Sequence, residues 1–166
     1  QQYHQFVDGE KPTGRIVSIS KSYVRPIVRG KETKKVEFGA KANKIQIDGI
    51  NFIEHLSFDA FNEGTRFQSS VWLAQELTHK RLSVMGADAI YATNENRSFA
   101  TNNRIRTDFC RKGRPGKHEK HRRQLADMIT KERASRLEGS FGKEKEHYHL
   151  KKIKARTKAN EILWIF

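Results

Sequence analysis

Three residues in the second half of the chain have the types and positions of candidate catalytic or ligand-binding groups. Asp88 follows the apolar run Leu82–Ala87 in GADAIYATNEN, and a strand there would hold its carboxylate rigidly at a sheet edge. Glu138 lies in the helical pattern RASRLEGSFGKEKEHY, and Lys145 follows seven residues later. Seven steps of about 100° return to within about 20° of the start, so Glu138 and Lys145 share one helix face. The residues alone leave open a helix cap for Asp88 and a solvated helix face for the other two.

Positive charge is concentrated in the same half of the chain. The 166 residues contain 33 Lys and Arg against 19 Asp and Glu, and residues 89–166 hold 20 of the cations and nine of the anions. The densest part is Cys110–Arg123, CRKGRPGKHEKHRR, with seven Lys and Arg to one Glu, and its Gly and Pro residues predict a loop leading into a helix. A loop of this charge suits a polyphosphate, although a solvated charge run is the alternative. The residues of this stretch that we expect to bind DNA are Arg111, Lys112, Arg114, Lys117, Arg122 and Arg123.

The elements that would position these residues alternate between strands and helices. Asp48-Gly49 between the runs Val36–Ile47 and Ile50–Phe58 predicts a hairpin, because this dipeptide suits a two-residue turn. Apolar spacing from Phe67 to Leu77 predicts a helix with one buried stripe. The further expected elements are strands at Arg15–Ile19, Leu82–Ala87 and Ile105–Phe109, a short helix at Thr93–Thr101, and a long helix at Glu119–Glu146 with apolar positions Leu125, Met128, Ile129, Leu137 and Phe141.

Composition excludes several classes of protein. The length suits about one domain, and no apolar run approaches the roughly 18 residues that would span a bilayer. The first residues lack the pattern of a signal peptide, and the single cysteine, Cys110, excludes an internal disulfide. Cys110 with His118 and His121 has no convincing spacing for zinc, and neither has the pair His147 and His149. We therefore expect a cytoplasmic protein.

The segments GADAIYATNENR, RLEGSFGKEKEHYHLKKIKAR and VRPIVRGKETKKVEFGAK together resemble the catalytic domain of bacterial insertion-sequence transposases of the Asp-Asp-Glu class. The resemblance implies an α/β, RNase H-like mixed sheet flanked by helices across residues 1–166, with a basic insertion at about 110–123. It also implies that Asp88 and Glu138 are the second and third catalytic carboxylates and hold Mg²⁺, which Mn²⁺ can replace. Lys145 would hold DNA near the cleaved end. In this family the protein acts on transposon ends and target DNA, as a homo-oligomer associated with the nucleoid, without a membrane or small-molecule substrate.

One catalytic residue of that family has no convincing equivalent in the chain. The first Asp would lie on the first central strand, but Arg15–Ile19 carries no carboxylate, and Glu37 and Asp48 belong to the expected hairpin. We expect this Asp and its strand to lie upstream of Gln1, so that the sheet is incomplete and the chain is inactive alone. The apolar run that ends at Phe166 is likewise expected to be an interrupted element.

Two other functions fit parts of the pattern. A non-catalytic basic module that binds DNA or RNA would explain the charge equally well. A metal-dependent nuclease on the same scaffold would share the carboxylates and the metal. Convergence of Asp88 and Glu138 separates the transposase from the binding module, and strand-transfer assays separate it from the nuclease.

Overall fold

The computed structural model describes residues 1–28 and 36–166, except for the side chain of Glu138. Residues 29–35, which form part of the segment VRPIVRGKETKKVEFGAK, lie outside the described residues. The chain forms two compact units. The first comprises Gln1–Ala42, His55–Phe61 and Lys152–Phe166, and the second comprises Asn43–Glu54 and Asn62–Lys151. The fold is mixed α/β, as the sequence predicted.

The described residues of the first unit form two short helices and a two-stranded sheet. Helix α1 spans Gln2–Asp8 and helix α6 spans Lys158–Ile165, while β1 (Pro26–Val28) pairs antiparallel with β2 (Val36–Phe38). Glu161 of α6 is buried, and it accepts hydrogen bonds from Lys21 Nζ at 2.7 Å and Tyr23 Oη at 2.8 Å. A buried carboxylate needs such partners, so these two contacts hold α6 within its unit.

The expected strand at Arg15–Ile19 is absent, and this prediction was wrong. These residues form irregular structure, and Ile19 is fully exposed. A strand needs a partner for its backbone groups and a buried face for its apolar side chains, and neither is available to this segment among the described residues.

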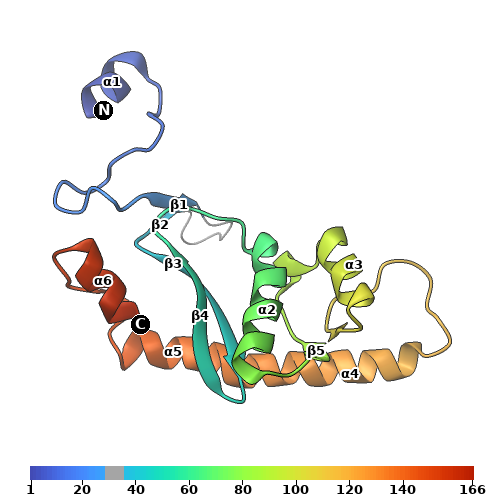
Figure 1. Cartoon of the computed structure of the whole chain (residues 1–166). Helices are drawn as coiled ribbons and strands as arrows, with labels where there is room; N and C mark the ends of the chain where they lie inside the picture. The colour runs from blue at the N-terminus through green and yellow to red at the C-terminus, as the bar shows by residue number, and fades with distance from the viewer. Residues whose placement is uncertain (29–35) are drawn as a thin grey trace. The chain divides into compact units, whose positions relative to one another are not determined.

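The predicted hairpin is confirmed. Strands β3 (Lys41–Ile47) and β4 (Ile50–Ser57) pair around Asp48-Gly49 (Figure 1). Both turn residues have positive φ, 50° at Asp48 and 87° at Gly49. Such a turn matches the twist of the flanking strands, and Asp and Gly are among the few residues that tolerate it. Strand β3 begins later than the sequence predicted, because Gly39 with φ of 116° separates β2 from it.

The core of the second unit lies between α2, α3 and the strand β6. Helix α2 (Phe67–Thr78) buries Phe67, Ser70, Val71 and Ala74, which confirms the predicted stripe over its first two turns. Helix α3 spans Asn94–Asn102, and its cap is Thr93, whose hydroxyl accepts the Asn96 N–H at 3.2 Å. The buried core cluster consists of Phe67, Val71, Ala100, Ile105 and Phe109.

Two short parallel strands cross this unit. β5 (Val84–Met85) pairs with β6 (Arg106–Thr107) in the register Val84 to Arg106 and Met85 to Thr107. Both strands are shorter than predicted: only Val84 and Met85 of the expected strand Leu82–Ala87 form β5, and Val84 is exposed. The described residues therefore form three separate two-stranded sheets in place of one joined sheet.

The long helix predicted at Glu119–Glu146 is present with one irregular segment. α4 (Glu119–Glu132) continues through a π-helical segment, η3 (Arg133–Glu138), into α5 (Gly139–Glu146), and the segments lie in line (Figure 1). Its predicted apolar stripe is only partly buried: Ile129 is buried, whereas Met128 and Phe141 are exposed. Among the described residues, no helix has the length and apolar character needed to cross a membrane.

Candidate active site and basic surface

The parallel pairing of β5 with β6 brings two carboxylates to one edge of this small sheet. Asp88 follows β5 by three residues, and Asp108 follows β6 directly. Parallel strands end at the same edge, which is where α/β proteins place ligands and catalytic groups. Asp108 was missed in the sequence because it fell inside the expected strand Ile105–Phe109. The available signal was a carboxylate at the end of a second strand beside the strand that precedes Asp88.

The Asp88 carboxylate is accessible. Its side chain is 73% exposed, and it caps the short helix η2 (Ala89–Tyr91), where Oδ1 accepts the Ala89 N–H at 2.6 Å. Its backbone carbonyl also accepts the Tyr91 N–H at 2.9 Å. Asp88 is therefore a helix cap and an exposed carboxylate at once, so the two interpretations of the sequence are compatible.

The Asp108 carboxylate is buried beneath the same edge. Its side chain is only 3% exposed, and Oδ1 accepts the Ala87 N–H at 3.0 Å, one residue before Asp88. A buried carboxylate needs a countercharge as well as hydrogen bonds. The guanidinium of Arg133 supplies positive charge here, with Nε 3.7 Å from Asp108 Oδ2.

Arg133 also faces Asp88, because its Nη1 lies 3.7 Å from Asp88 Oδ1. It is the first residue of the π-helical segment, and π-helical turns inside α-helices occur frequently at functional sites. The Arg133 Nε atom is buried and has no hydrogen-bond partner. A guanidinium thus lies between the two strand-end carboxylates and is closely bonded to neither.

The structure leaves the convergence of Asp88 and Glu138 as a prediction. Glu138 is the last residue of η3, but its side chain lies outside the description. Lys145 is exposed in the last turn of α5, seven residues further along. The η3 segment contributes Arg133 to the surroundings of Asp88, and Glu138 ends the same segment.

The donor set is compatible with Mg²⁺ at Asp88. This ion prefers hard oxygen ligands and retains several waters, so an exposed carboxylate at a sheet edge suits it. Within residues 1–28 and 36–166, excluding the undescribed Glu138 side chain, no group of three or more His, Cys, Asp and Glu is arranged to hold a metal ion. A shared metal at Asp88 and Glu138 stays a prediction, whereas the Asp108 carboxylate is buried and faces the guanidinium of Arg133.

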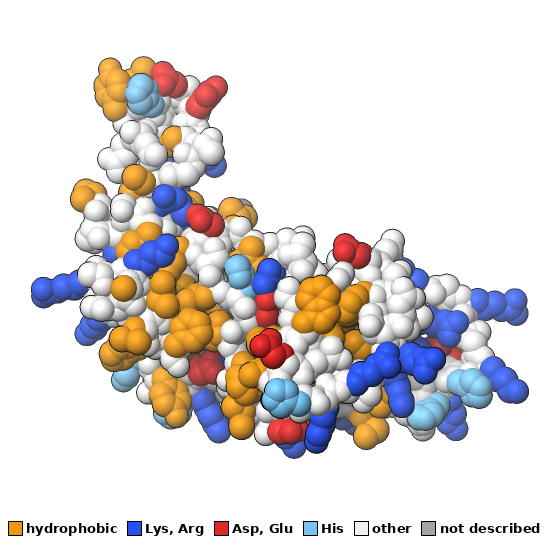
Figure 2. Space-filling model, in the orientation of Figure 1, with side chains coloured by type: hydrophobic (Ala, Val, Ile, Leu, Met, Phe, Trp, Pro, Cys, Tyr) orange, Lys and Arg blue, Asp and Glu red, His pale blue; other side chains and the backbone are white. Residues whose placement is uncertain are grey.

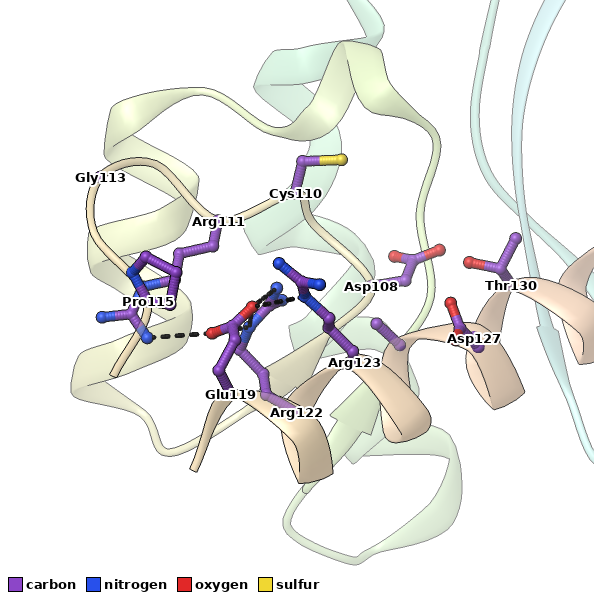
Figure 3. Close-up of a pocket in the computed structure, with 11 residues that line it drawn as sticks. Asp108, Cys110, Arg111, Gly113, Pro115, Glu119, Arg122, Arg123, Asp127 and Thr130 are labelled. Carbon is purple, nitrogen blue, oxygen red and sulfur yellow. Dashed lines mark hydrogen bonds and ion pairs between the residues drawn. The ribbon is translucent and has the colours of Figure 1, made fainter. Parts of the chain in front are cut away.

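The loop before α4 and the first turns of α4 form a basic surface centred on one carboxylate. Glu119 accepts contacts from Arg122 Nη2 at 2.7 Å, Arg123 Nε at 3.2 Å and Arg111 Nη1 at 3.2 Å (Figure 3). The hydrogen bond from Arg122 is the largest of the effects that lower the pKa of Glu119 to about 2, and the bonds from Arg123 and Arg111 add to it. Glu119 thus holds three of the predicted DNA-binding arginines together, and the cluster of four side chains carries a net charge of +2.

The other loop residues that are predicted to bind DNA are exposed to solvent. Lys112, Arg114 and Lys117 are exposed, and Lys112 donates a hydrogen bond to Asn94 Oδ1 at 2.8 Å. Figure 2 shows Lys and Arg side chains gathered over this end of the second unit. A shallow pocket of about 410 Å³ lies between the loop and α4, with Asp108 and Asp127 among the residues that line it (Figure 3). The basic loop and Asp108 therefore line one pocket beside α4.

A buried polar network supports the segment that carries Asp88. Tyr91 Oη donates a hydrogen bond to Asn43 Oδ1, and Asn43 Nδ2 donates to Glu54 Oε2 at 2.8 Å and to Ser70 Oγ at 3.0 Å. Glu54 is also paired with Arg66. Burial, followed by the negative charges of Glu63, Glu54 and Asp88, raises the pKa of Tyr91 well above its ordinary value. The network joins the hairpin and α2 to the η2 turn, three residues from Asp88.

Residues 85–165 match the family described as the transposase DDE domain, a segment that includes Asp88, Glu138, Lys145 and the basic surface. This match supports the sequence-based prediction of a DDE-class transposase fragment over residues 85–165. No curated protein and no solved structure matches the chain significantly.

Proposed function

We propose that the chain serves metal-dependent DNA strand cleavage and strand transfer in the transposition of a bacterial insertion sequence. The observation that carries the proposal is the position of Asp88. It is an exposed carboxylate at the end of a parallel strand, within the segment that matches the transposase DDE domain. The basic surface at Arg111–Arg123 on the same unit supports the proposal, because phosphate contacts position nucleic acid at a site.

In this proposal residues 1–166 form part of a catalytic domain of the RNase H-like type. Asp88 and Glu138 hold Mg²⁺ or Mn²⁺, which when bound activates the attacking hydroxyl and stabilises the leaving oxygen of a phosphodiester. Lys145 contacts DNA near the cleaved end. Transposon ends and target DNA are the partners, the protein acts as a homo-oligomer, and the place of action is the bacterial cytoplasm at the nucleoid.

In this proposal, separate parts of the chain position the metal-binding carboxylates and contact the DNA. The η2 cap and the network under Tyr91 fix the backbone that carries Asp88, while η3 and α5 carry Glu138 and Lys145 on one continuous helix. Arg111, Arg122 and Arg123 are clustered by Glu119, so phosphate meets guanidinium groups whose side-chain freedom is already reduced.

Iron-directed cleavage of the polypeptide tests whether Asp88 and Glu138 share a metal. Fe²⁺ bound in place of Mg²⁺, with ascorbate and peroxide, cuts the backbone close to its ligands. We expect cuts near residues 88 and 138, suppression by excess Mg²⁺, and loss of both cuts in Asp88→Asn and in Glu138→Gln. Asp59→Asn, which alters an exposed carboxylate elsewhere, is the control and should leave the cuts unchanged.

Two results would contradict the proposal. Cuts at residue 88 without cuts at residue 138 would show that the two carboxylates do not share an ion. DNA binding without localised cuts at either position would favour the non-catalytic basic module. If both cuts appear, joining of a DNA 3′ end to a target separates a transposase from a nuclease.

A further inference from the structure

Arg133 lies between two carboxylates that differ sharply in exposure. We infer that its guanidinium exchanges between Asp88 and Asp108, and that Asp108 is the partner that receives it when a divalent cation occupies Asp88. Arg133 and Asp108 are then positioning residues that control access to Asp88. The inference rests on the proposed role of Asp88 as a cation ligand.

The contact distances show that Arg133 is hydrogen-bonded to neither carboxylate. Nη1 to Asp88 Oδ1 and Nε to Asp108 Oδ2 are both 3.7 Å, which is an ion-pair distance but too long for a hydrogen bond. The buried Nε has no hydrogen-bond partner. A buried donor left unpaired is unfavourable, and a small movement toward Asp108 would satisfy it.

Asp108 is suited to receive the guanidinium. Its Oδ1 is occupied by the Ala87 N–H, which leaves Oδ2 facing Arg133 Nε. Its side chain is almost fully buried, so an ion pair there is weakly screened and a lost countercharge is costly. The attraction between Asp108 and Arg133 therefore persists whatever happens at Asp88.

Asp88 is suited to release the guanidinium. Its exposed carboxylate is screened by water, so the pair with Arg133 contributes little to stability and breaks easily. Its Oδ1 keeps the Ala89 N–H as a second partner. A cation arriving at Asp88 would repel Arg133 toward Asp108, and the positive charge of Arg133 would then be neutralised by a neighbouring carboxylate.

Asp108 thereby preserves the affinity of Asp88 for a cation. Without the Asp108 charge, Asp88 is the remaining carboxylate of the two, and Arg133 would pair with it directly. Arg133 would then compete with the cation for Asp88 Oδ1. We therefore expect the buried Asp108 carboxylate, through Arg133, to strengthen cation binding at the exposed Asp88 carboxylate.

Mn²⁺ binding to the 166-residue chain, measured by electron paramagnetic resonance, tests this exchange without an activity assay. Asp108→Asn keeps an oxygen for the Ala87 N–H, and we expect it to weaken Mn²⁺ binding about tenfold, the low end of what a neighbouring charge does to an ionic equilibrium at a carboxylate. Arg133→Gln in the Asp108→Asn background should restore binding, because it removes the competitor. Asp127→Asn, an exposed carboxylate that lines the same pocket, is the charge-matched control and should bind as the unaltered chain does.

The double variant decides between exchange and a purely structural role. If Asp108→Asn and Arg133→Gln together bind Mn²⁺ as weakly as Asp108→Asn alone, Arg133 is not a competitor and the inference is overturned. Unchanged binding in Asp108→Asn overturns it as well. Circular dichroism on each variant establishes that the fold is kept, and the second measurement below decides the matter if Asp108→Asn does not fold.

The Nε–Hε signal of Arg133 in nitrogen-15 NMR, assigned by its loss in Arg133→Gln, reports the partner directly. Asp88→Asn should move this signal to the position of a hydrogen-bonded guanidinium, and saturating Mg²⁺ should move it in the same direction. A signal unaffected by Asp88→Asn overturns the exchange. The signal could move in Asp88→Asn while Mn²⁺ binding does not depend on Asp88. That result would overturn the proposed function but leave the exchange of Arg133 between the two carboxylates standing.

Discussion

A β-carbon added to Gly86 would lie 2.5 Å from Cγ2 of Ile129, which is closer than real side-chain carbons approach one another. Gly86 follows β5, and Ile129 is the buried residue of α4. The absent side chain lets the helix pack against the strand end, one turn before the helix reaches Arg133. The glycine of GADAIY therefore sets the distance between α4 and the segment that carries Asp88.

Gly86→Ala should destabilise the chain by about 1–3 kcal/mol, the usual effect of overpacking a well-filled site. Ile129→Ala should also destabilise it, by about 2–5 kcal/mol, because a buried side chain is lost. The double variant should cost less than the two changes together, since the alanine at residue 86 would occupy the space that Ile129 leaves. Urea unfolding of the four proteins measures the coupling, and strict additivity would contradict the contact.

Tyr91→Phe should lower the free energy of unfolding by about 1–3 kcal/mol, because Asn43 Oδ1 would lose its hydrogen-bond donor inside a buried network. Tyr3→Phe, an exposed tyrosine, is the matched control and should have almost no effect. Thermal or chemical unfolding measures both variants. Equal stability of the two would show that the network under the η2 turn contributes nothing.

The cluster at Glu119 should make stability depend on pH in the acid range. Because Arg122, Arg123 and Arg111 lower the pKa of Glu119 from 4.5 to about 2, the folded chain binds this proton less readily than the unfolded chain does. The contribution of Glu119 is therefore complete above about pH 4.5 and is lost as the pH falls toward 2.

Glu119→Gln should remove this part of the acid sensitivity, and unfolding at pH 6 and at pH 3 measures the difference. Glu132→Gln is the control in the same helix, since Glu132 is an exposed residue paired with Arg136. Between pH 6 and pH 3, Glu119→Gln should lose less stability than Glu132→Gln. Equal losses would show that the arginine cluster does not lower the pKa of Glu119.

DNA binding should depend on the exposed cations of the basic loop. Changing Lys112, Arg114 and Lys117 to Ala should weaken binding and lower the slope of log affinity against log salt by about two to three, because each phosphate contact contributes about 0.9. Changing the exposed cations Lys80, Arg81 and Lys131 to Ala removes the same charge elsewhere in this unit and is the control. Fluorescence anisotropy at several salt concentrations gives both slopes, and equal slopes for the two triple variants would exclude a specific role for the loop.

Turns, caps and helix faces could be predicted from the sequence. Asp48-Gly49 predicted the hairpin, apolar spacing predicted α2 and the long helix, and Thr93 or Asn94 as a cap predicted the start of α3. Turns, caps and amphipathic faces depend on residues close in the chain. The resemblance to DDE-class transposases also came from contiguous motifs, GADAIYATNENR and RLEGSFGKEKEHY, and residues 85–165 match the transposase DDE domain.

Pairing between distant segments required the tertiary structure. No local pattern places Asp108 beside Asp88, or Arg133 between them, because these contacts depend on the parallel register of β5 with β6 and on the packing of α4 across Gly86. The strand expected at Arg15–Ile19 failed for the same reason, since β propensity forms a strand only where a partner supplies hydrogen bonds and a buried face. Residue types and spacing thus singled out Asp88 and Glu138 as candidate carboxylates, whereas the charges that surround Asp88 followed from how the chain folds back on itself.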